Sequence, residues 1–79
     1  MKSLVVFTAA WSEASQAIAP VLTGLSVPVR QIDIEERPTL AALYGVKAVP
    51  AFVLCVGDNI VANKVGFKTI DEIESFIAQ

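Results

Sequence analysis

The sequence predicts a small α/β sandwich of element order βαβαββα, with a four-stranded mixed sheet and helices on both of its faces. Apolar runs rich in β-branched residues, typical of buried strands, alternate with segments whose apolar residues recur at helical spacing. The first strand–helix–strand unit predicts a parallel strand pair with a right-handed crossover. Later in the chain, Gly-Asp-Asn at 57–59 separates two apolar runs and predicts a hairpin.

The first half of the chain contains the parallel unit. Residues 4–7 form a continuous apolar run, as expected of a strand buried on both faces. A helix is predicted over 12–25, because apolar residues recur there at i, i+3, i+4 and i+7, namely Ile18, Val21, Leu22 and Leu25. Pro20 lies inside this helix, removes one backbone hydrogen bond and predicts a kink. The second strand is predicted over 29–34.

The second half adds a helix, the hairpin and a last helix. Pro38 suits the first turn of the second helix, and Gly45 suits its left-handed end. The predicted buried face of that helix consists of Leu40, Leu43 and Tyr44. The hairpin strands are predicted over 51–56 and 60–65. Thr69 and Glu72 form a capping box that begins the last helix, whose apolar face continues through Ile73, Phe76 and Ile77.

Composition excludes several classes of function. We expect a single domain over residues 1–79, since a chain of this length supports one core. Hydrophobic residues make up 54% and charged residues 18%, which excludes disorder. The six basic residues never cluster, so nucleic-acid binding is not expected. No apolar run approaches the roughly 20 residues that span a bilayer. With one cysteine and no histidine, neither a disulfide framework nor a soft-ligand metal site can be built within one chain, and we expect no metal and no cofactor.

A targeting segment is an alternative interpretation of the N-terminus. Met1 and Lys2 precede an apolar stretch that ends in Thr8-Ala9-Ala10, which imitates a short signal peptide with a small-residue cleavage site. Cleavage there would remove a predicted internal strand of the domain. We therefore expect a cytoplasmic protein.

Four segments are similar to the thioredoxin family in their order and spacing. They are FTAAWSEASQAIAP, IDIEERPTLAALYGVKAVPAF, DNIVANKVGF and TIDEIESFI. On these segments the chain resembles thioredoxin from residue 5 to its C-terminus, without the extra N-terminal strand and helix of full-length members. Its minimal layout is closer to glutaredoxin. The resemblance implies a thioredoxin-like fold, thiol–disulfide exchange and electron transfer in cell redox homeostasis.

The resemblance also implies a site. Ser12 and Ser15 stand where the family has its nucleophilic and resolving cysteines. The implied substrate-binding residues, among them a proline that is cis in the family, are Trp11, Val49, Pro50 and Gly66. The implied partners are protein disulfide substrates or a thioredoxin- or glutaredoxin-type reductase, and we expect a monomer. From the residues alone, a cap for Ser12 and plain burial for Trp11 stay open as alternatives.

The departures from the family leave two hypotheses. Serine hydroxyls cannot form the disulfide that dithiol chemistry requires, and no histidine activates them. The chain is then either a disulfide oxidoreductase in a Cys-to-Ser form or a natural, redox-dead module for binding or assembly. Val6 replaces a buried aspartate of many members, and Gln31 stands where a lysine is frequent, which favours the second hypothesis somewhat. Cys55 lies mid-strand and is expected to be a buried, inert thiol.

Overall fold

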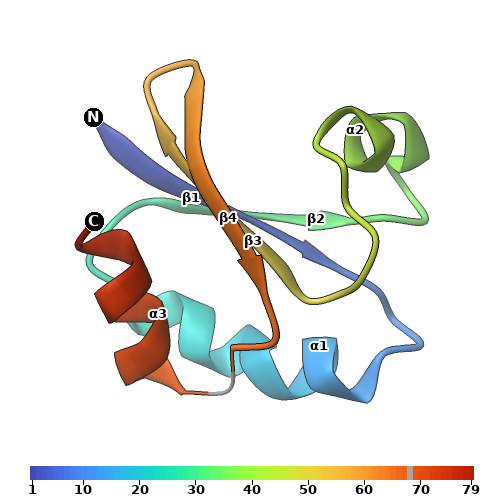
Figure 1. The fold of residues 1–79 in the computed structure, drawn as a ribbon. Helices are drawn as coiled ribbons and strands as arrows, with labels where there is room; N and C mark the ends of the chain where they lie inside the picture. The colour runs from blue at the N-terminus through green and yellow to red at the C-terminus, as the bar shows by residue number, and fades with distance from the viewer. Residues whose placement is uncertain (68) are drawn as a thin grey trace.

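A four-stranded mixed sheet of strand order β2-β1-β3-β4 forms the centre of the molecule (Figure 1). The computed structural model describes residues 1–67 and 69–79. The strand β1 (Lys2–Thr8) pairs in parallel with β2 (Val29–Asp33) and antiparallel with β3 (Ala51–Val56). The strand β4 (Asn59–Val65) pairs antiparallel with β3 and forms one edge. The predicted α/β architecture and its strand connections are confirmed.

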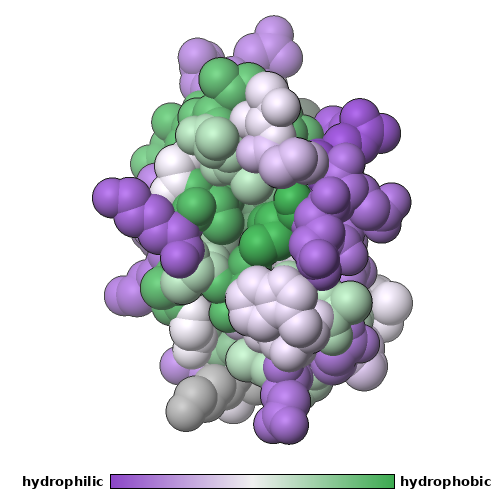
Figure 2. Space-filling view, turned by 90° about the vertical axis from the view of Figure 1, so that its right-hand side faces the viewer, coloured by the Kyte–Doolittle hydropathy of each residue, from purple (hydrophilic) through white to green (hydrophobic). Residues whose placement is uncertain are grey.

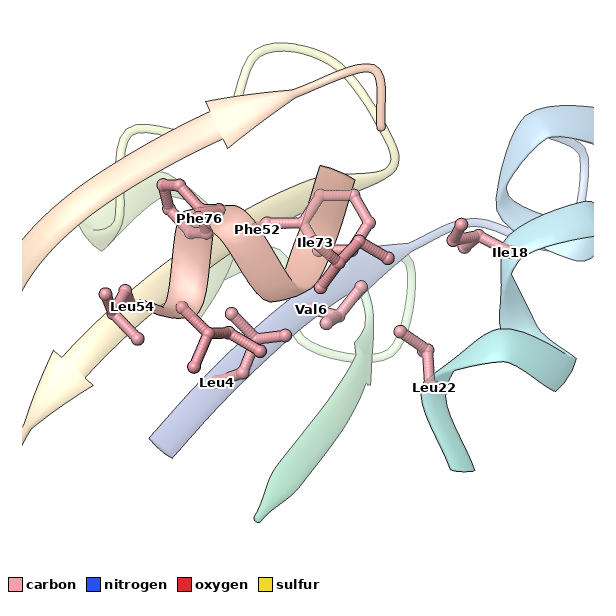
Figure 3. Close-up of a cluster of buried hydrophobic side chains, with 9 residues drawn as sticks. Leu4, Val6, Ile18, Leu22, Phe52, Leu54, Ile73 and Phe76 are labelled. Atoms are coloured by element: carbon pink, nitrogen blue, oxygen red, sulfur yellow. The ribbon is translucent and has the colours of Figure 1, made fainter. Parts of the chain in front are cut away.

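Helices cover both faces of the sheet. Successive buried side chains of β1 point to opposite faces, so each face needs a cover. The helices α1 (Glu13–Ile18) and α3 (Ile70–Ile77) lie on one face, with the 3₁₀ segment η1 (Ala19–Gly24) between them in the fold, and α2 (Pro38–Leu43) lies on the other (Figure 1). The core of the first face consists of Leu4, Val6, Ile18, Leu22, Phe52, Leu54, Ile73, Phe76 and Ile77 (Figure 3). The core under α2 consists of Val5, Phe7, Ile32, Ala41, Ala51, Val53 and Cys55.

The predicted helix over 12–25 is not continuous. It is an α-helix only through Ile18 and then tightens into the 3₁₀ segment η1, which contains Pro20 in its first turn. Proline has no N–H to donate to the carbonyl of Gln16, and its ring crowds that carbonyl, so α-helical bonding cannot pass this point. Ile18 and Leu22 still reach the core on either side of the break.

Most of the other local signals lie where the sequence predicts them. Pro38 is in the first turn of α2, and Gly45 follows that helix with φ of +70°. Gly57, with φ of +60°, turns the hairpin between β3 and β4. In the capping box, the Glu72 N–H donates to Thr69 Oγ1 over 3.2 Å and the Thr69 N–H donates to Glu72 Oε1 over 3.1 Å.

The buried face of α2 is smaller than predicted. Leu40 and Tyr44 pack against the core, but Leu43 is 76% exposed. The ring of Tyr44 lies 5.1 Å from that of Phe7, so the residue after the helix covers the sheet in place of Leu43. Because α2 has only six residues, it leaves part of this sheet face open.

Candidate functional site

Three buried polar side chains gather where β1 ends and α1 begins. Within the described part of the chain, Thr8, Ser12 and Ser15 are the buried residues with polar or charged side chains. The other buried side chains are apolar, so the polar part of the interior lies at this end of β1. Such groups cost free energy when buried unless they are hydrogen-bonded, so their partners define what the site does.

Ser12 is the N-cap of α1. Its Oγ accepts a hydrogen bond from the Ser15 N–H over 3.2 Å, and its backbone is extended, as a cap residue requires. Its own N–H donates to the Ala9 carbonyl over 3.1 Å, which closes the turn between β1 and the helix. Capping is therefore a confirmed structural role of Ser12, and 9% of the residue stays accessible.

Ser15 lies one turn deeper and is 1% exposed. Its Oγ accepts a hydrogen bond from the buried N–H of Ala9 over 3.3 Å. The two hydroxyls thus connect the last turn before α1 to the helix itself, each by one backbone amide. Nothing in the sequence pattern pointed to Ala9 as the partner, because the contact depends on how the turn folds back.

The floor of the site carries no ionisable side chain at the two positions singled out from the family. Val6 is fully buried in the apolar core with Ile18 and Leu22. Gln31 donates from Nε2 to Thr8 Oγ1 over 3.2 Å, across the parallel pair of β1 and β2. Thr8 was missed by sequence reasoning, and its only signal was its place at the end of the first apolar run.

Trp11 and Val49 are brought together in one pocket. Trp11 is 67% exposed, which argues against plain burial. The pocket has a volume of about 150 Å³ and is lined by Trp11, Ile34, Ala41, Val46, Lys47, Ala48 and Val49. The Val49–Pro50 peptide bond that follows is cis.

Gly66 lies beside Pro50 through the register of the hairpin. Ala51 pairs with Val65, so Pro50 and Gly66 are the residues one step beyond that pair on the two strands. Gly66 has φ of +85°, which a residue with a side chain rarely adopts, and it is exposed. The four implied substrate-binding residues therefore lie around the start of α1 and the end of the sheet nearest to it.

Cys55 lies elsewhere. It pairs across the sheet with Ser3 near the start of β1, whereas Ala51 pairs with Phe7 at the end nearer the candidate site. It is 7% exposed, and burial raises the pKa of its thiol. Cys55 lines a depression of about 600 Å³ together with residues such as Arg30 and Tyr44. That depression contains none of the predicted site residues, so its size alone does not make it the functional site.

Residues 1–67 and 69–79 contain neither a cluster of metal ligands nor a helix that could span a membrane. No three histidine, cysteine, aspartate or glutamate side chains come together there in a group that would hold a metal ion. None of the helices in these ranges is long and apolar enough to cross a bilayer.

Comparison with known proteins gives the family. The thioredoxin family model matches residues 1–79. A four-stranded mixed sheet, a helix that begins at the end of β1 and a Val-Pro loop beside that helix define a thioredoxin-like protein. The chain belongs to the thioredoxin family.

Individual relatives agree with this assignment. The chain is 31% identical to thioredoxin of Buchnera aphidicola from Acyrthosiphon pisum, over 94% of this chain and 74% of that protein. It is 32% identical to thioredoxin C-2 of Corynebacterium nephridii, over 96% of this chain and 76% of that protein. Among solved structures, a mutant thioredoxin of Halobacterium salinarum is similar with a TM-score of 0.88 and 31% identity, over 96% and 71% of the two chains. Fasciola hepatica thioredoxin has a TM-score of 0.89 and 26% identity, over 98% and 78%.

Proposed function

We propose that this chain binds extended polypeptide clients on the surface around Trp11, Val49, Gly66 and the largely buried Pro50, and that Ser12 and Ser15 make it inactive in thiol–disulfide exchange. The observation that carries the proposal is the position of the two serines. They occupy the start of α1 directly beside the exposed Trp11, where a dithiol would have to stand. The backbone before the cis-proline would pair with the client by strand-like hydrogen bonds.

The chemistry of the site supports redox inactivity. Exchange needs a thiolate that attacks a disulfide sulfur and a second thiol that resolves the mixed disulfide. Both hydroxyls at the site act as hydrogen-bond acceptors for backbone amides, and the chain contains no histidine to activate either. Val6 supplies no carboxylate beneath them. If cysteines stood at 12 and 15, the first would be the nucleophile and the second would resolve.

Two versions of this function remain distinct. In the first, the chain is a Cys-to-Ser form of a protein-disulfide oxidoreductase, which the intact surface around the serines supports. In the second, it is a natural binding or assembly module. The second is supported by the hydrogen bonds of both hydroxyls, since a thiol is a weaker acceptor and would hold the Ala9 amide less well. It is also supported by the apolar residue at position 6.

Reduction of insulin by dithiothreitol tests the proposal. We expect the unchanged chain to match a reaction without protein, and measurable turnover would overturn redox inactivity. The variant S12C/S15C, prepared with Cys55→Ala to remove the other thiol, distinguishes the two versions. Turnover by that variant supports the oxidoreductase version, at a rate below that of thioredoxins with a buried acid. A folded but inactive double-cysteine variant supports the binding module.

Partners and location form part of the same proposal. Protein disulfide substrates, or a thioredoxin- or glutaredoxin-type reductase, would contact the surface around Trp11. We expect a monomer in the cytoplasm, where an unpaired thiol such as Cys55 stays reduced. Size-exclusion chromatography with light scattering tests the oligomeric state.

A further inference from the structure

A second pocket lies on the other side of the loop that ends in Val49. This loop leads from α2 to β3, and the pocket between it and the strands β3 and β4 has a volume of about 170 Å³. Val46, Lys47 and Ala48 line this pocket and also the pocket of Trp11, so the two hollows lie on either side of one stretch of backbone. We call them the β4-side pocket and the Trp11 pocket.

The strand register shows which side chains form the sheet wall of the β4-side pocket. Ala51 and Val53 belong to the core under α2, and they pair across the sheet with Val65 and Asn63. Because paired residues direct their side chains to the same face of a sheet, the side chains of Asn63 and Val65 also lie on the pocket's side. The side chain of Lys64 leaves the strand on the opposite face. The sheet wall of this pocket is therefore apolar except for one amide.

Each pocket has room for one apolar side chain. An apolar cavity of about 150 Å³ holds a molecule the size of benzene, and the Trp11 pocket and the β4-side pocket measure about 150 and 170 Å³. Figure 2 looks at the side of the molecule that carries α2 and the start of α1, and it shows apolar side chains in a central hollow with hydrophilic side chains on both sides.

The backbone between the two pockets is open to pairing with another chain. Within residues 1–67 and 69–79, no hydrogen bond joins the peptide groups of Lys47, Ala48 or Val49 to another residue. Backbone N–H and C=O groups are strong hydrogen-bonding groups, and an extended polypeptide that lies along this stretch supplies partners for them.

Strand-like pairing at this stretch directs neighbouring client residues to opposite sides of the loop. Val49 lines the Trp11 pocket but not the β4-side pocket. A client residue opposite Val49 therefore directs its side chain to the Trp11 pocket, because paired residues share a face. Successive side chains of an extended chain point in opposite directions, so the next client residue directs its side chain to the β4-side pocket.

From this arrangement we propose that the clients are extended segments with two consecutive apolar residues, one for each pocket. One side chain packs against Trp11, and its neighbour enters the β4-side pocket beside Asn63 and Val65. A segment in which apolar and polar residues alternate fills only one of the two pockets. This inference rests on the proposed function in one respect, namely that an extended polypeptide is held beside Trp11.

Peptides that differ only in the spacing of leucine test the proposal. Trp11 is the single tryptophan of the chain, so its fluorescence reports binding. We would titrate the protein with eight-residue peptides of serine and glutamine that contain one leucine, two adjacent leucines, or two leucines separated by one residue. We expect the adjacent pair to bind about tenfold more tightly than the single leucine, on the scale of partial burial of a second leucine side chain. The separated pair should bind like the single leucine, because its second side chain points the same way as its first.

Filling the β4-side pocket tests the assignment to that pocket. In Asn63→Phe the ring would occupy the pocket, so we expect the advantage of the adjacent pair to disappear while the single-leucine peptide still binds. Asn59→Phe is the matched control, because it makes the same substitution on the same strand, and Asn59 pairs with Val56 and lines neither pocket. We expect this control to keep the peptide preference of the unchanged chain.

The outcomes separate the two proposals, and the peptide series on the unchanged protein decides the inference even if a variant does not fold. If the adjacent and separated pairs bind equally well, or if Asn63→Phe and Asn59→Phe alter the preference alike, the two-pocket inference is wrong and polypeptide binding stands. If none of the peptides binds, the proposed function fails and this inference fails with it.

Discussion

The buried hydroxyls at the end of β1 and the buried thiol of β3 differ in what surrounds them. Ser12 and Ser15 each accept a hydrogen bond from a backbone amide, beside the exposed Trp11. Cys55 lies among apolar neighbours near the opposite end of the same sheet, where burial raises the pKa of its thiol. The backbone amides at Ser12 and Ser15 would favour an anion, whereas the apolar surroundings of Cys55 disfavour one. The single thiol of the chain therefore lies where the thiolate is disfavoured, and the two serine hydroxyls lie where a thiolate would be favoured.

The largest expected effect comes from placing one thiol at each position in turn. We compare C55A/S12C, C55A/S15C and the unchanged chain, whose single thiol is Cys55. A thiolate at 12 would accept the hydrogen bond that the Ser15 N–H now donates to the hydroxyl, which lowers the thiol pKa. Each unit of that lowering raises the thiolate fraction about tenfold at neutral pH.

The rates of mixed-disulfide formation with a small aromatic disulfide measure this difference. We expect the order 12, then 15, then 55, with at least about a tenfold step after the first. Position 15 is slower because it is 1% exposed, against 9% for position 12. Equal rates at 12 and 15, or the reverse order, would show that the family's roles do not transfer to this chain. The same reagent in denaturant provides the control, because all three thiols should then react alike.

The sequence predicted the helices and strands, and it singled out Ser12, Ser15 and Cys55. It did not predict the hydrogen bonds that make the surroundings of the serines differ from those of the cysteine. Apolar periodicity and the capping box were sufficient for the order of elements along the chain and for α3, since both are local patterns. The break at Ile18 was predicted only as a kink, because the choice between α and 3₁₀ bonding after Pro20 depends on packing. The partner of Ser15 required the folded turn.

Removal of each hydroxyl has a smaller effect, which should differ between the two serines. Ser15→Ala leaves the buried amide of Ala9 without its acceptor, and an unsatisfied buried donor costs about 1–3 kcal/mol. Ser12→Ala removes a helix cap, which costs about 1 kcal/mol, and Ser12 lies nearer to solvent than Ser15, with 9% of the residue exposed against 1%. We expect the larger loss in unfolding free energy for Ser15→Ala.

Urea unfolding of both variants against the unchanged protein gives the two free energies. Ser75→Ala, at an exposed position of α3, is a suitable control and should stay within about 0.5 kcal/mol of the unchanged protein. A larger loss for Ser12→Ala than for Ser15→Ala would mean that the cap, rather than the Ala9 contact, holds the start of α1 to the sheet.

The smallest expected effect concerns Cys55 and pH. Burial raises the pKa of its thiol, so the folded protein retains this proton to a higher pH than the unfolded chain does. Stability from this group is fully present below the unfolded pKa of about 8.5 and declines as the pH rises from there through the folded pKa. The unfolding free energy must be measured between pH 7 and 10 in both the unchanged protein and Cys55→Ala, because the difference between the two curves isolates the thiol. We expect the decline to be shallower in Cys55→Ala, because alanine has no proton to lose. Parallel curves would mean that the thiol is accessible to water in the folded protein, and the contrast between the two ends of the sheet would then reduce to the hydrogen bonds of Ser12 and Ser15.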